Sequence, residues 1–307
     1  MPKVAILLGL CEGQRYLRAQ LDSIGRQTLT DWVLVVSDDS ATPQGRRIVA
    51  EFAKAQAPGR VRIIAGPGRG AARNYLHLIQ HIPPDAAFAA FCDQDDVWVR
   101  DKLVRAVLAL DAVHDGRPAV VFAGRVVCDA TLGRQRLAAM PTRPPSFRNA
   151  LVQNILPGNT LVLNAAAMRL CAITARWAGD IAMHDWWVYQ IVTGAGGQVL
   201  CDPVPAVLYR QHGANLVGAA QGARSLAVRV VRAIGGRHRR WVGAHLRALT
   251  GAADYLTAEN RQTLDRFAAL RRASLPQRLR RFSGLGLYRQ TGAGQGMLWL
   301  QMALGRI

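Results

Sequence analysis

Three carboxylates crowd the segment CDQDDVW, residues 92–98, immediately after the apolar run AAFAAF. Asp93, Asp95 and Asp96 carry like charges that repel one another, so we expect a positive group to face them. Clustered oxygen ligands suit a hard divalent cation such as Mg²⁺ or Mn²⁺, which takes one or two protein carboxylates and fills its shell with water and substrate phosphates. We expect one of Asp93 and Asp95 to hold a ribose hydroxyl and the other to hold the metal. Asp96 then caps the helix expected near Val99, and the alternative is that all three aspartates only cap that helix.

A second acidic pair, Asp38-Asp39, follows the apolar segment WVLVVS at residues 32–37. A carboxylate at the end of a strand can accept hydrogen bonds from a nucleobase or a ribose. The same residues, followed by SATP, are also good turn formers through Asx-type hydrogen bonds. Both interpretations stay open on the local sequence.

Glycines precede a helix start in GPGRGAARN, residues 66–74, which is typical of a phosphate-binding turn. Arg69 and Arg73 supply positive charge there, and we expect Arg73 to contribute to nucleotide binding. The segment lacks the Lys-Ser/Thr pair of a P-loop and the GxGxxG spacing, so a plain turn before a helix is the alternative.

Two later segments place polar side chains beside aromatic ones. In HDWW, Asp185 follows His184 at a predicted helix start, and a carboxylate in an aromatic, partly dry setting is basic enough to act as a general base. The alternative is a helix cap with core tryptophans. In YRQHGAN, Arg210 can bind a phosphate and His212 can complete a metal site.

Strand and helix signals alternate through the first half of the chain, which predicts a doubly wound, mostly parallel α/β sheet. Expected strands are at 3–10, 32–37, 61–65, 86–92 and 118–127, and expected helices at 14–27, 46–56, 71–80 and 101–113. Further on we expect a short helix and a strand within 149–164, helices at 165–177 and 184–197, and two strands at 198–202 and 206–212. Ligands of such sheets bind beyond the carboxyl ends of the strands, where both acidic loops fall.

The chain of 307 residues has a formal net charge of +19, concentrated after Gly218, where 16 arginines face three acidic residues. Amphipathic helices are expected there at 225–234, 240–256 and 260–273. Such a segment suits an anionic membrane surface or nucleic acid, and a merely solvated basic face is the alternative. We predict a cytoplasmic protein from three features of the sequence. The five cysteines show no ligand spacing, the N-terminal apolar run suits a first strand better than a signal peptide, and no apolar run is long enough to cross a membrane.

In order and spacing, these segments resemble a family-2 glycosyltransferase of the GT-A fold, of the bacterial rhamnosyltransferase-like branch. The resemblance runs from Val4 to about Asn215 and includes RYLRAQLDSI, VVSDDSAT, GPGRGAARNY, FCDQDDVW, GNTLVLN, HDWW and YRQHGAN. It departs after the first strand, where GLCEG replaces the usual Thr-Tyr-Asn-Gly type of loop. Contacts of that loop with the nucleotide are therefore not carried over.

The resemblance implies a role for each motif. Asp38 or Asp39 and Asp93 would bind the nucleotide, and Asp95 with His212 would hold Mg²⁺ or Mn²⁺. Asp185 would be the catalytic base. The pocket for donor diphosphate, sugar or acceptor would include six further residues: Gly158, Asn159, Thr160, His184, Trp186 and Arg210.

We therefore predict an inverting, metal-dependent glycosyltransferase that moves a sugar from a nucleotide-diphosphate donor to a lipid-linked or glycan acceptor in polysaccharide synthesis. The nearest branch suggests rhamnose as the sugar, and glucose, galactose and N-acetylhexosamines are the alternatives. Residues 1–217 would form the catalytic domain, with a nucleotide-binding half at 1–100 and an acceptor-binding half at 101–217. Residues 218–307 would form a basic, amphipathic helical tail on the inner face of the plasma membrane. The alternatives are a nucleic-acid-binding protein and a metal-dependent nucleotidyltransferase or phosphohydrolase. Sparse aromatics in the tail and the acidic loops argue against nucleic acid.

Overall fold

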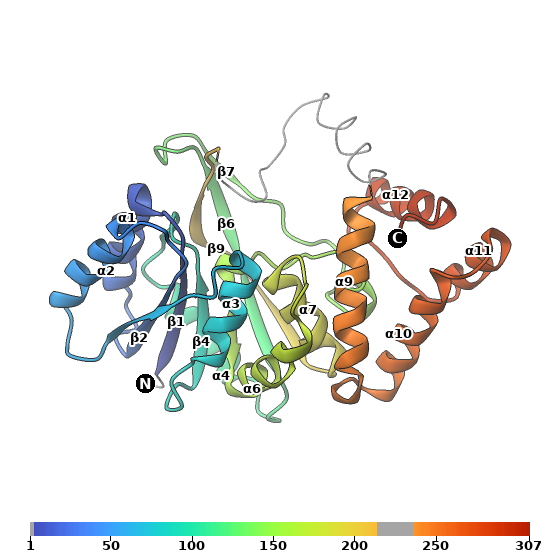
Figure 1. The fold of residues 1–307 in the computed structure, drawn as a ribbon, viewed down its shortest axis with the longest axis horizontal. Helices are drawn as coiled ribbons and strands as arrows, with labels where there is room; N and C mark the ends of the chain where they lie inside the picture. Colours follow the sequence, from blue (N-terminus) through green and yellow to red (C-terminus); the bar gives the residue numbers. More distant parts are fainter. Residues whose placement is uncertain (1–2, 214–235) are drawn as a thin grey trace.

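A sheet flanked by helices forms one side of the molecule, and a group of helices forms the other, in a computed structural model that describes residues 3–213 and 236–307 (Figure 1). The N-terminal end lies at the sheet and the C-terminus at the far helices (Figure 1). Asn215 of the YRQHGAN motif and the helix expected at 225–234 lie outside the described residues.

The nine strands of the sheet run in the order β3-β2-β1-β4-β8-β6-β9-β5, with β7 paired to β6. They are β1 (Val4–Leu10), β2 (Trp32–Asp38), β3 (Val61–Ala65), β4 (Phe88–Cys92), β5 (Val97–Trp98), β6 (Ala119–Cys128), β7 (Gln135–Leu137), β8 (Val162–Asn164) and β9 (Gln198–Arg210). Strands β3, β2, β1 and β4 pair in parallel, and their buried apolar runs suit a sheet covered on both faces. Beyond β4 the sheet becomes mixed, because β8 runs antiparallel to β4 and β6.

The two strands expected at 198–202 and 206–212 are one strand, β9, so that prediction is wrong. Its register with β6 shifts on both sides of Gly124, where an added Cβ would lie 2.7 Å from the Pro203 carbonyl oxygen. Prolines cannot donate a ladder hydrogen bond. The neighbouring β5 pairs only with Val207 and Leu208, so Pro203 and Pro205 lie outside that ladder and the strand continues through them.

Helices cover both faces of the sheet. They are α1 (Gln14–Gly25), α2 (Gln44–Lys54), α3 (Ala71–Gln80), α4 (Lys102–Asp111), α5 (Phe147–Ala150), α6 (Ala165–Thr174) and α7 (His184–Gly194), with the 3₁₀ turns η1 (Gly158–Thr160) and η2 (Ala175–Trp177). Apolar residues of α1, α2 and α4 share one hydrophobic cluster with the sheet, and those of α3, α6 and α7 share the other. The doubly wound α/β architecture predicted from the sequence is confirmed.

The basic C-terminal segment is helical, as predicted, and packs into the same core as the α/β part. It comprises α9 (Arg237–Gly251), η3 (Ala253–Tyr255), α10 (Ala258–Leu270), α11 (Leu275–Ser283) and α12 (Gly292–Ala303). Leu249, Phe267 and Met302 belong to the hydrophobic cluster that contains Trp187 of α7. None of the described helices is both long and apolar enough to cross a membrane.

Candidate active site

The acidic loop, residues 93–96, begins with an aspartate that accepts a hydrogen bond from a tyrosine of α3. Strand β4 ends at Cys92, and the Tyr75 hydroxyl of α3 donates to Asp93 Oδ1 at 2.6 Å. Burial and the nearby Asp95 raise the pKa of the Asp93 carboxyl to about 6. The ring of Tyr75 stacks on His184 with centroids 3.8 Å apart, which joins the acidic loop to the start of α7.

Asp95 lies beside the end of strand β9. His212 Nε2 is 2.7 Å from Asp95 Oδ2, and both side chains remain 17% exposed. Arg210 is buried, and its Nε donates to the Asp95 carbonyl oxygen at 2.8 Å while its Nη1 donates to Ala130 at 2.6 Å. The structure therefore brings Asp95 and His212 together, and it uses Arg210 to brace the loop that carries Asp95.

The expectation that Asp96 caps the following helix is wrong. Helix α4 begins at Lys102 after Asp101, and Asp96 is fully buried before it. The Asp96 carboxylate accepts hydrogen bonds from the Arg210 backbone N–H at 3.0 Å and from Asn159 Nδ2 at 2.5 Å. Its physical role is to tie the acidic loop to β9 and to η1, because a buried carboxylate needs such donors.

A buried lysine lies beneath the acidic loop and was not predicted as a site residue. Lys102 Nζ donates to the Asn159 carbonyl oxygen at 2.7 Å and sits 3.4 Å from the Trp98 ring centroid. Burial lowers its pKa to about 7, while Asp96 and Asp93 partly offset that effect. Its burial could have been inferred from the sequence, because Lys102 lies four residues before Ala106 and so falls on the buried, apolar face of α4.

Asp185 lies near the N-terminus of α7 and faces η1. Its Oδ2 accepts from the Gly158 backbone N–H at 3.1 Å, and its Oδ1 accepts from the Trp186 N–H at 2.7 Å. Burial raises the pKa of the Asp185 carboxyl to about 6, although these hydrogen bonds oppose the shift. An acid with this pKa is matched to taking a proton near neutral pH.

His184 contributes a buried ring beside Asp185. Its pKa falls to about 3 because burial disfavours the charged imidazolium, so the ring is neutral. Its Nε2 is buried with no hydrogen-bond partner within the described part of the chain. A Cβ added at Gly158 would lie 3.0 Å from that nitrogen, so the glycine allows η1 to approach α7.

Asp38 and Asp39 lie at the end of β2, and each makes a turn contact. Asp38 Oδ1 accepts from the Ser40 N–H at 3.0 Å, which is the Asx-type alternative. Asp39 Oδ1 accepts from the Gly68 N–H at 2.7 Å and so fastens the GPGRG turn to β2. Arg73 of α3 lies against the loop before α7, where a Cβ added at Gly179 would be 2.7 Å from its Nη2.

The loop after β1, where the chain departs from the family pattern, is anchored to the acidic loop. The Gln94 side chain accepts from the Cys11 N–H at 2.8 Å and donates to the Cys11 carbonyl oxygen at 2.9 Å. A Cβ at Gly13 would lie 2.3 Å from the Gln94 amide, so a larger residue there would displace this side chain. Gln94 and Tyr75 were both inside the recognised motifs, but their roles depend on contacts between distant segments.

Three predicted pocket residues are engaged within the protein. Trp186 is 1% exposed, and its Nε1 donates to the Ala150 carbonyl oxygen at 2.6 Å, so it lies in the core and not in the pocket. Asn159 and Thr160 are also buried, each 2% exposed. Of the η1 residues, Gly158 is the one that contacts Asp185.

The donor set at the acidic loop fits a divalent cation that binds together with a phosphate ligand. Among residues 3–213 and 236–307, no group of three or more His, Cys, Asp or Glu side chains is arranged to hold a metal by itself. Asp95 and His212 form a pair, and Mg²⁺ and Mn²⁺ are commonly held by one or two protein ligands plus substrate phosphates and water. The pair can therefore hold such an ion once a diphosphate supplies the remaining oxygens.

Comparisons with known proteins identify the family of the chain. The family model described as Glycosyl transferase family 2 matches residues 10–174, which is more than half of the chain. A dTDP-rhamnosyl transferase, RfbG of Shigella flexneri, is 28% identical over 67% of this chain and 72% of its own length. WfgD of Escherichia coli, named a UDP-Glc:alpha-D-GlcNAc-diphosphoundecaprenol beta-1,3-glucosyltransferase, is 28% identical over 33% of this chain and 38% of its own length.

Solved structures share the fold. S. aureus TarS in complex with UDP-GlcNAc has a TM-score of 0.56 at 14% identity, with 85% of this chain and 70% of that chain covered. The mannosyltransferase PcManGT from Pyrobaculum calidifontis, in complex with GDP-Man and Mn²⁺, has a TM-score of 0.51 at 17% identity. That alignment covers 99% of this chain and 85% of the other.

Proposed function

Since the chain belongs to glycosyl transferase family 2 and is therefore a sugar-transferring enzyme, we propose that it moves a sugar from a nucleotide-diphosphate donor to an acceptor hydroxyl with inversion at the anomeric carbon. One observation carries this proposal: the stacked Tyr75 and His184 rings join the nucleotide-side Asp93 to the segment that bears Asp185. This contact supports a site in which Asp93 would bind the donor and Asp185 would act as the base.

Donor binding is assigned to the strand ends. Asp93 accepts from the ribose, and Asp38 or Asp39 lies where the base and ribose would reach the end of β2. Asp95 and His212 would hold Mg²⁺ or Mn²⁺, and such an ion would supply positive charge for the departing diphosphate. The Mn²⁺ in the complex of PcManGT with GDP-Man supports this cation class.

The acceptor is activated by Asp185. Its carboxylate takes the proton of the acceptor hydroxyl as that oxygen bonds to the anomeric carbon. The bond from that carbon to the donor phosphate oxygen breaks on the opposite face, and the nucleoside diphosphate leaves with the bonding electrons. A single displacement inverts the configuration. The hydrogen bond from the Gly158 N–H holds Asp185 in position for this step.

The substrates are proposed from relatives and charge. RfbG is named a dTDP-rhamnosyl transferase, so a deoxyhexose such as rhamnose is the first donor sugar to test. WfgD acts on a diphosphoundecaprenol-linked sugar, which supports a lipid-linked acceptor in polysaccharide synthesis. The Arg-rich helices would rest on anionic lipid at the cytoplasmic face of the membrane.

A thermal-shift screen of dTDP-rhamnose, UDP-glucose, UDP-GlcNAc and GDP-mannose, each with Mn²⁺, Mg²⁺ or a chelator, tests donor binding. We expect one donor to raise the melting temperature only when a divalent cation is present. Asp95→Asn should abolish the metal-dependent part of the shift, while the exposed Asp111→Asn serves as the charge-matched control. Equal stabilisation by a donor with and without the chelator would contradict the assignment of Asp95 and His212.

A further inference from the structure

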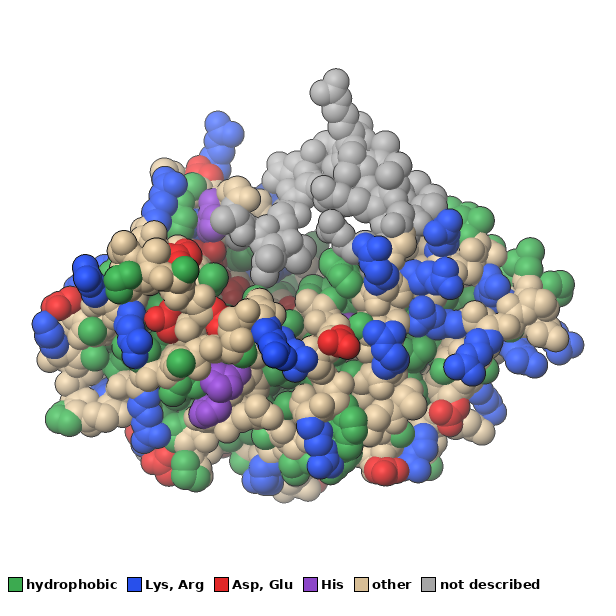
Figure 2. Space-filling model, viewed as in Figure 1, with side chains coloured by type: hydrophobic (Ala, Val, Ile, Leu, Met, Phe, Trp, Pro, Cys, Tyr) green, Lys and Arg blue, Asp and Glu red, His purple; other side chains and the backbone are tan. Residues whose placement is uncertain are grey.

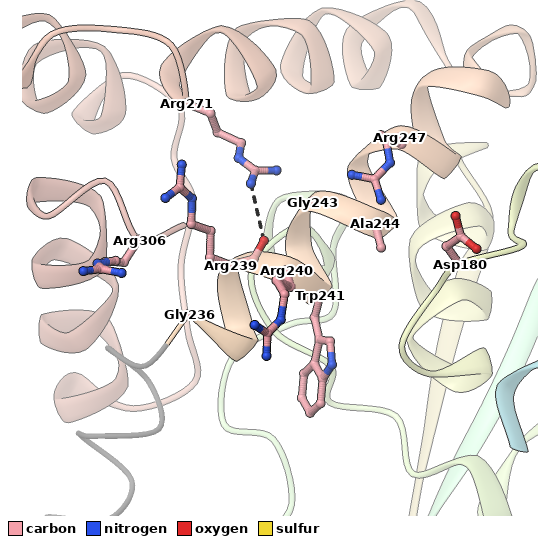
Figure 3. A pocket seen from close by; sticks show the side chains of 10 residues that line it. All are labelled: Asp180, Gly236, Arg239, Arg240, Trp241, Gly243, Ala244, Arg247, Arg271 and Arg306. Atoms are coloured by element: carbon pink, nitrogen blue, oxygen red, sulfur yellow. Dashed lines mark hydrogen bonds between the residues drawn. The ribbon is translucent and has the colours of Figure 1, made fainter. Parts of the chain in front are cut away.

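A pocket of about 590 Å³ lies along α9, away from the acidic loop, and arginines dominate its wall (Figure 3). They are Arg239, Arg240, Arg247, Arg271 and Arg306. The pocket is lined by residues of α9, of the end of α10, of the C-terminus and, through Asp180, of the loop before α7, so four separate segments converge on it (Figure 3). In Figure 2, Lys and Arg side chains gather over this helical side of the molecule.

The positive charge of this pocket is not neutralised by the protein. None of its five arginines forms an ion pair with a carboxylate of the described residues, and residues 214–235 contain no Asp or Glu. Two of the three acidic residues after Gly218 pair elsewhere, Asp254 with Arg261 and Glu259 with Arg148. The one acidic residue in the wall, Asp180, is exposed.

Like charges are held close together inside the pocket. The Arg271 Nη2 donates to the Arg239 carbonyl oxygen at 3.4 Å, which turns the Arg271 guanidinium toward α9 (Figure 3). Burial lowers the pKa of Arg271, and the neighbouring charges of Arg239 and Arg247 lower it further. A polyanion would remove this repulsion, and guanidinium groups are well suited to bind phosphate oxygens in pairs.

The N-terminal end of α9 adds to this potential. Its first turn contains no acidic residue and includes Arg239 and Arg240, and its N-cap Gly236 makes no side-chain cap bond. Positive side chains at the positive end of a helix dipole are unfavourable unless an anion binds there. The basic first turn therefore destabilises α9 as an isolated helix, and a bound phosphate would offset that unfavourable charge.

Helix α9, which forms most of the pocket wall, packs against the segment that carries Asp185. Asp180 lies five positions before Asp185 in the chain, in the loop that leads into α7. Helix α9 packs on that loop and on α7 itself: His245 Nε2 accepts from the Ala182 N–H at 3.2 Å, and its Nδ1 lies 2.7 Å from Gln190 Oε1. The metal-binding pair Asp95 and His212 is instead placed by β4 and β9.

We propose that this arginine pocket binds the diphosphate group of a lipid-linked acceptor. This inference rests on the proposed function and names the residues that would bind the phosphates of that acceptor. The proposed function assigns the nucleotide-sugar donor to the acidic loop, so a second polyanion site, on the helix that packs against α7, suits an acceptor that itself carries phosphates. Trp241, which also lines the pocket, offers an apolar surface for the start of the lipid chain.

Binding of farnesyl diphosphate to the full-length protein, measured by isothermal titration calorimetry in phosphate-free buffer, tests the proposal. The double variant Arg247→Gln/Arg271→Gln should bind it about tenfold more weakly or worse, because charge-assisted contacts are lost. The control Arg266→Gln/Arg280→Gln removes the same charge from exposed positions outside this pocket and should change affinity less than about twofold. Nucleotide-sugar binding with Mn²⁺ should be the same in all three proteins, which also verifies their folding.

Two further probes separate the possible phosphate sources. Inorganic phosphate should bind much more weakly than farnesyl diphosphate, and vesicles of phosphatidylcholine with phosphatidylglycerol should bind the pocket variant and the control variant alike. Unchanged farnesyl diphosphate affinity in the pocket variant would overturn the proposal, as would pocket-dependent binding of the vesicles alone. If no donor binds in the thermal-shift screen but farnesyl diphosphate binds the pocket, the proposed function is contradicted and the anion site is supported. If a donor binds but farnesyl diphosphate affinity does not depend on the pocket, only the proposed anion site is contradicted.

Discussion

At Asp185 the same burial that makes the carboxylate basic also costs stability. The group sits beside the neutral His184 and accepts hydrogen bonds from backbone N–H groups, yet its pKa is raised to about 6. The hydrogen bonds to its charged form are therefore too few to offset the desolvation. Burial therefore makes the Asp185 carboxylate more basic, as its proposed role requires, and destabilises its charged form in the folded state.

Replacing Asp185 by Asn should stabilise the fold at high pH and not at low pH. The folded-state pKa lies above the ordinary value of 3.8, so the contribution of Asp185 to stability is present at low pH and is lost as pH rises through about 6. Above pH 7 the variant should gain up to about 3 kcal/mol, the equivalent of a shift of about two units. Melting temperatures at pH 4 and pH 8 measure this, with the exposed Asp111→Asn as control. An equal change in melting temperature at both pH values would show that Asp185 is not strained.

Among the elements, the contact between η1 and α7 sets the geometry of the base. Gly158 donates its N–H to Asp185 and leaves room for the His184 ring. The side chain of the neighbouring Asn159 donates a hydrogen bond to the buried Asp96, and Lys102 Nζ donates to the Asn159 carbonyl oxygen. The acidic loop, η1 and α7 are therefore coupled through buried hydrogen bonds.

Gly158→Ala should misplace the base without removing it. The added Cβ would lie 3.0 Å from His184 Nε2 and 3.3 Å from Asp185 Cβ, so these side chains must move by a few tenths of an ångström. We expect kcat to fall about ten- to a hundredfold with little change in donor Kd. Gly296→Ala on α12, where an added Cβ meets nothing within 4 Å, is the matched control. Loss of donor binding in parallel with kcat would assign Gly158 a purely structural role.

The sequence predicted most helices and the long strands other than β9, because their apolar periodicity and turn residues are local signals. It missed β5 and β7, which are two and three residues long and too short to show a period. In the candidate site, the motifs identified Asp93, Asp95 and Asp185, because carboxylates at strand and helix ends stand out. The roles of Tyr75 and Lys102 depend on contacts with residues 18 and 57 positions away, which no local pattern reports.

At the scale of the whole molecule, the basic helices complete the hydrophobic core. Trp186 lies with its ring centroid 4.5 Å from that of His245 on α9, and Asn260 of α10 donates to carbonyl oxygens at the end of α7. The division at residue 217 stays a prediction about function. For stability, the shared core indicates that the two parts depend on each other.

His245→Ala should therefore destabilise the chain as a unit. His245 is 1% exposed, and its loss leaves a cavity beside Trp186 and removes the partner of Gln190 Oε1. We expect a loss of about 2 to 4 kcal/mol and one melting transition at lower temperature. The exposed His114→Ala should melt like the unaltered protein. Two separate transitions by calorimetry would show that the basic helices fold independently of the α/β part.

The most direct test of the account is turnover by Asp185→Asn. The assay measures nucleoside diphosphate released from the donor identified in the screen, with Mn²⁺ and a lipid-linked acceptor. We predict that release requires the acceptor and that the variant is about 10²- to 10⁴-fold slower, while its donor Kd stays within about twofold of the unaltered protein. Full turnover by Asp185→Asn with unchanged donor binding would contradict the assignment of this aspartate as the base and with it the proposed mechanism.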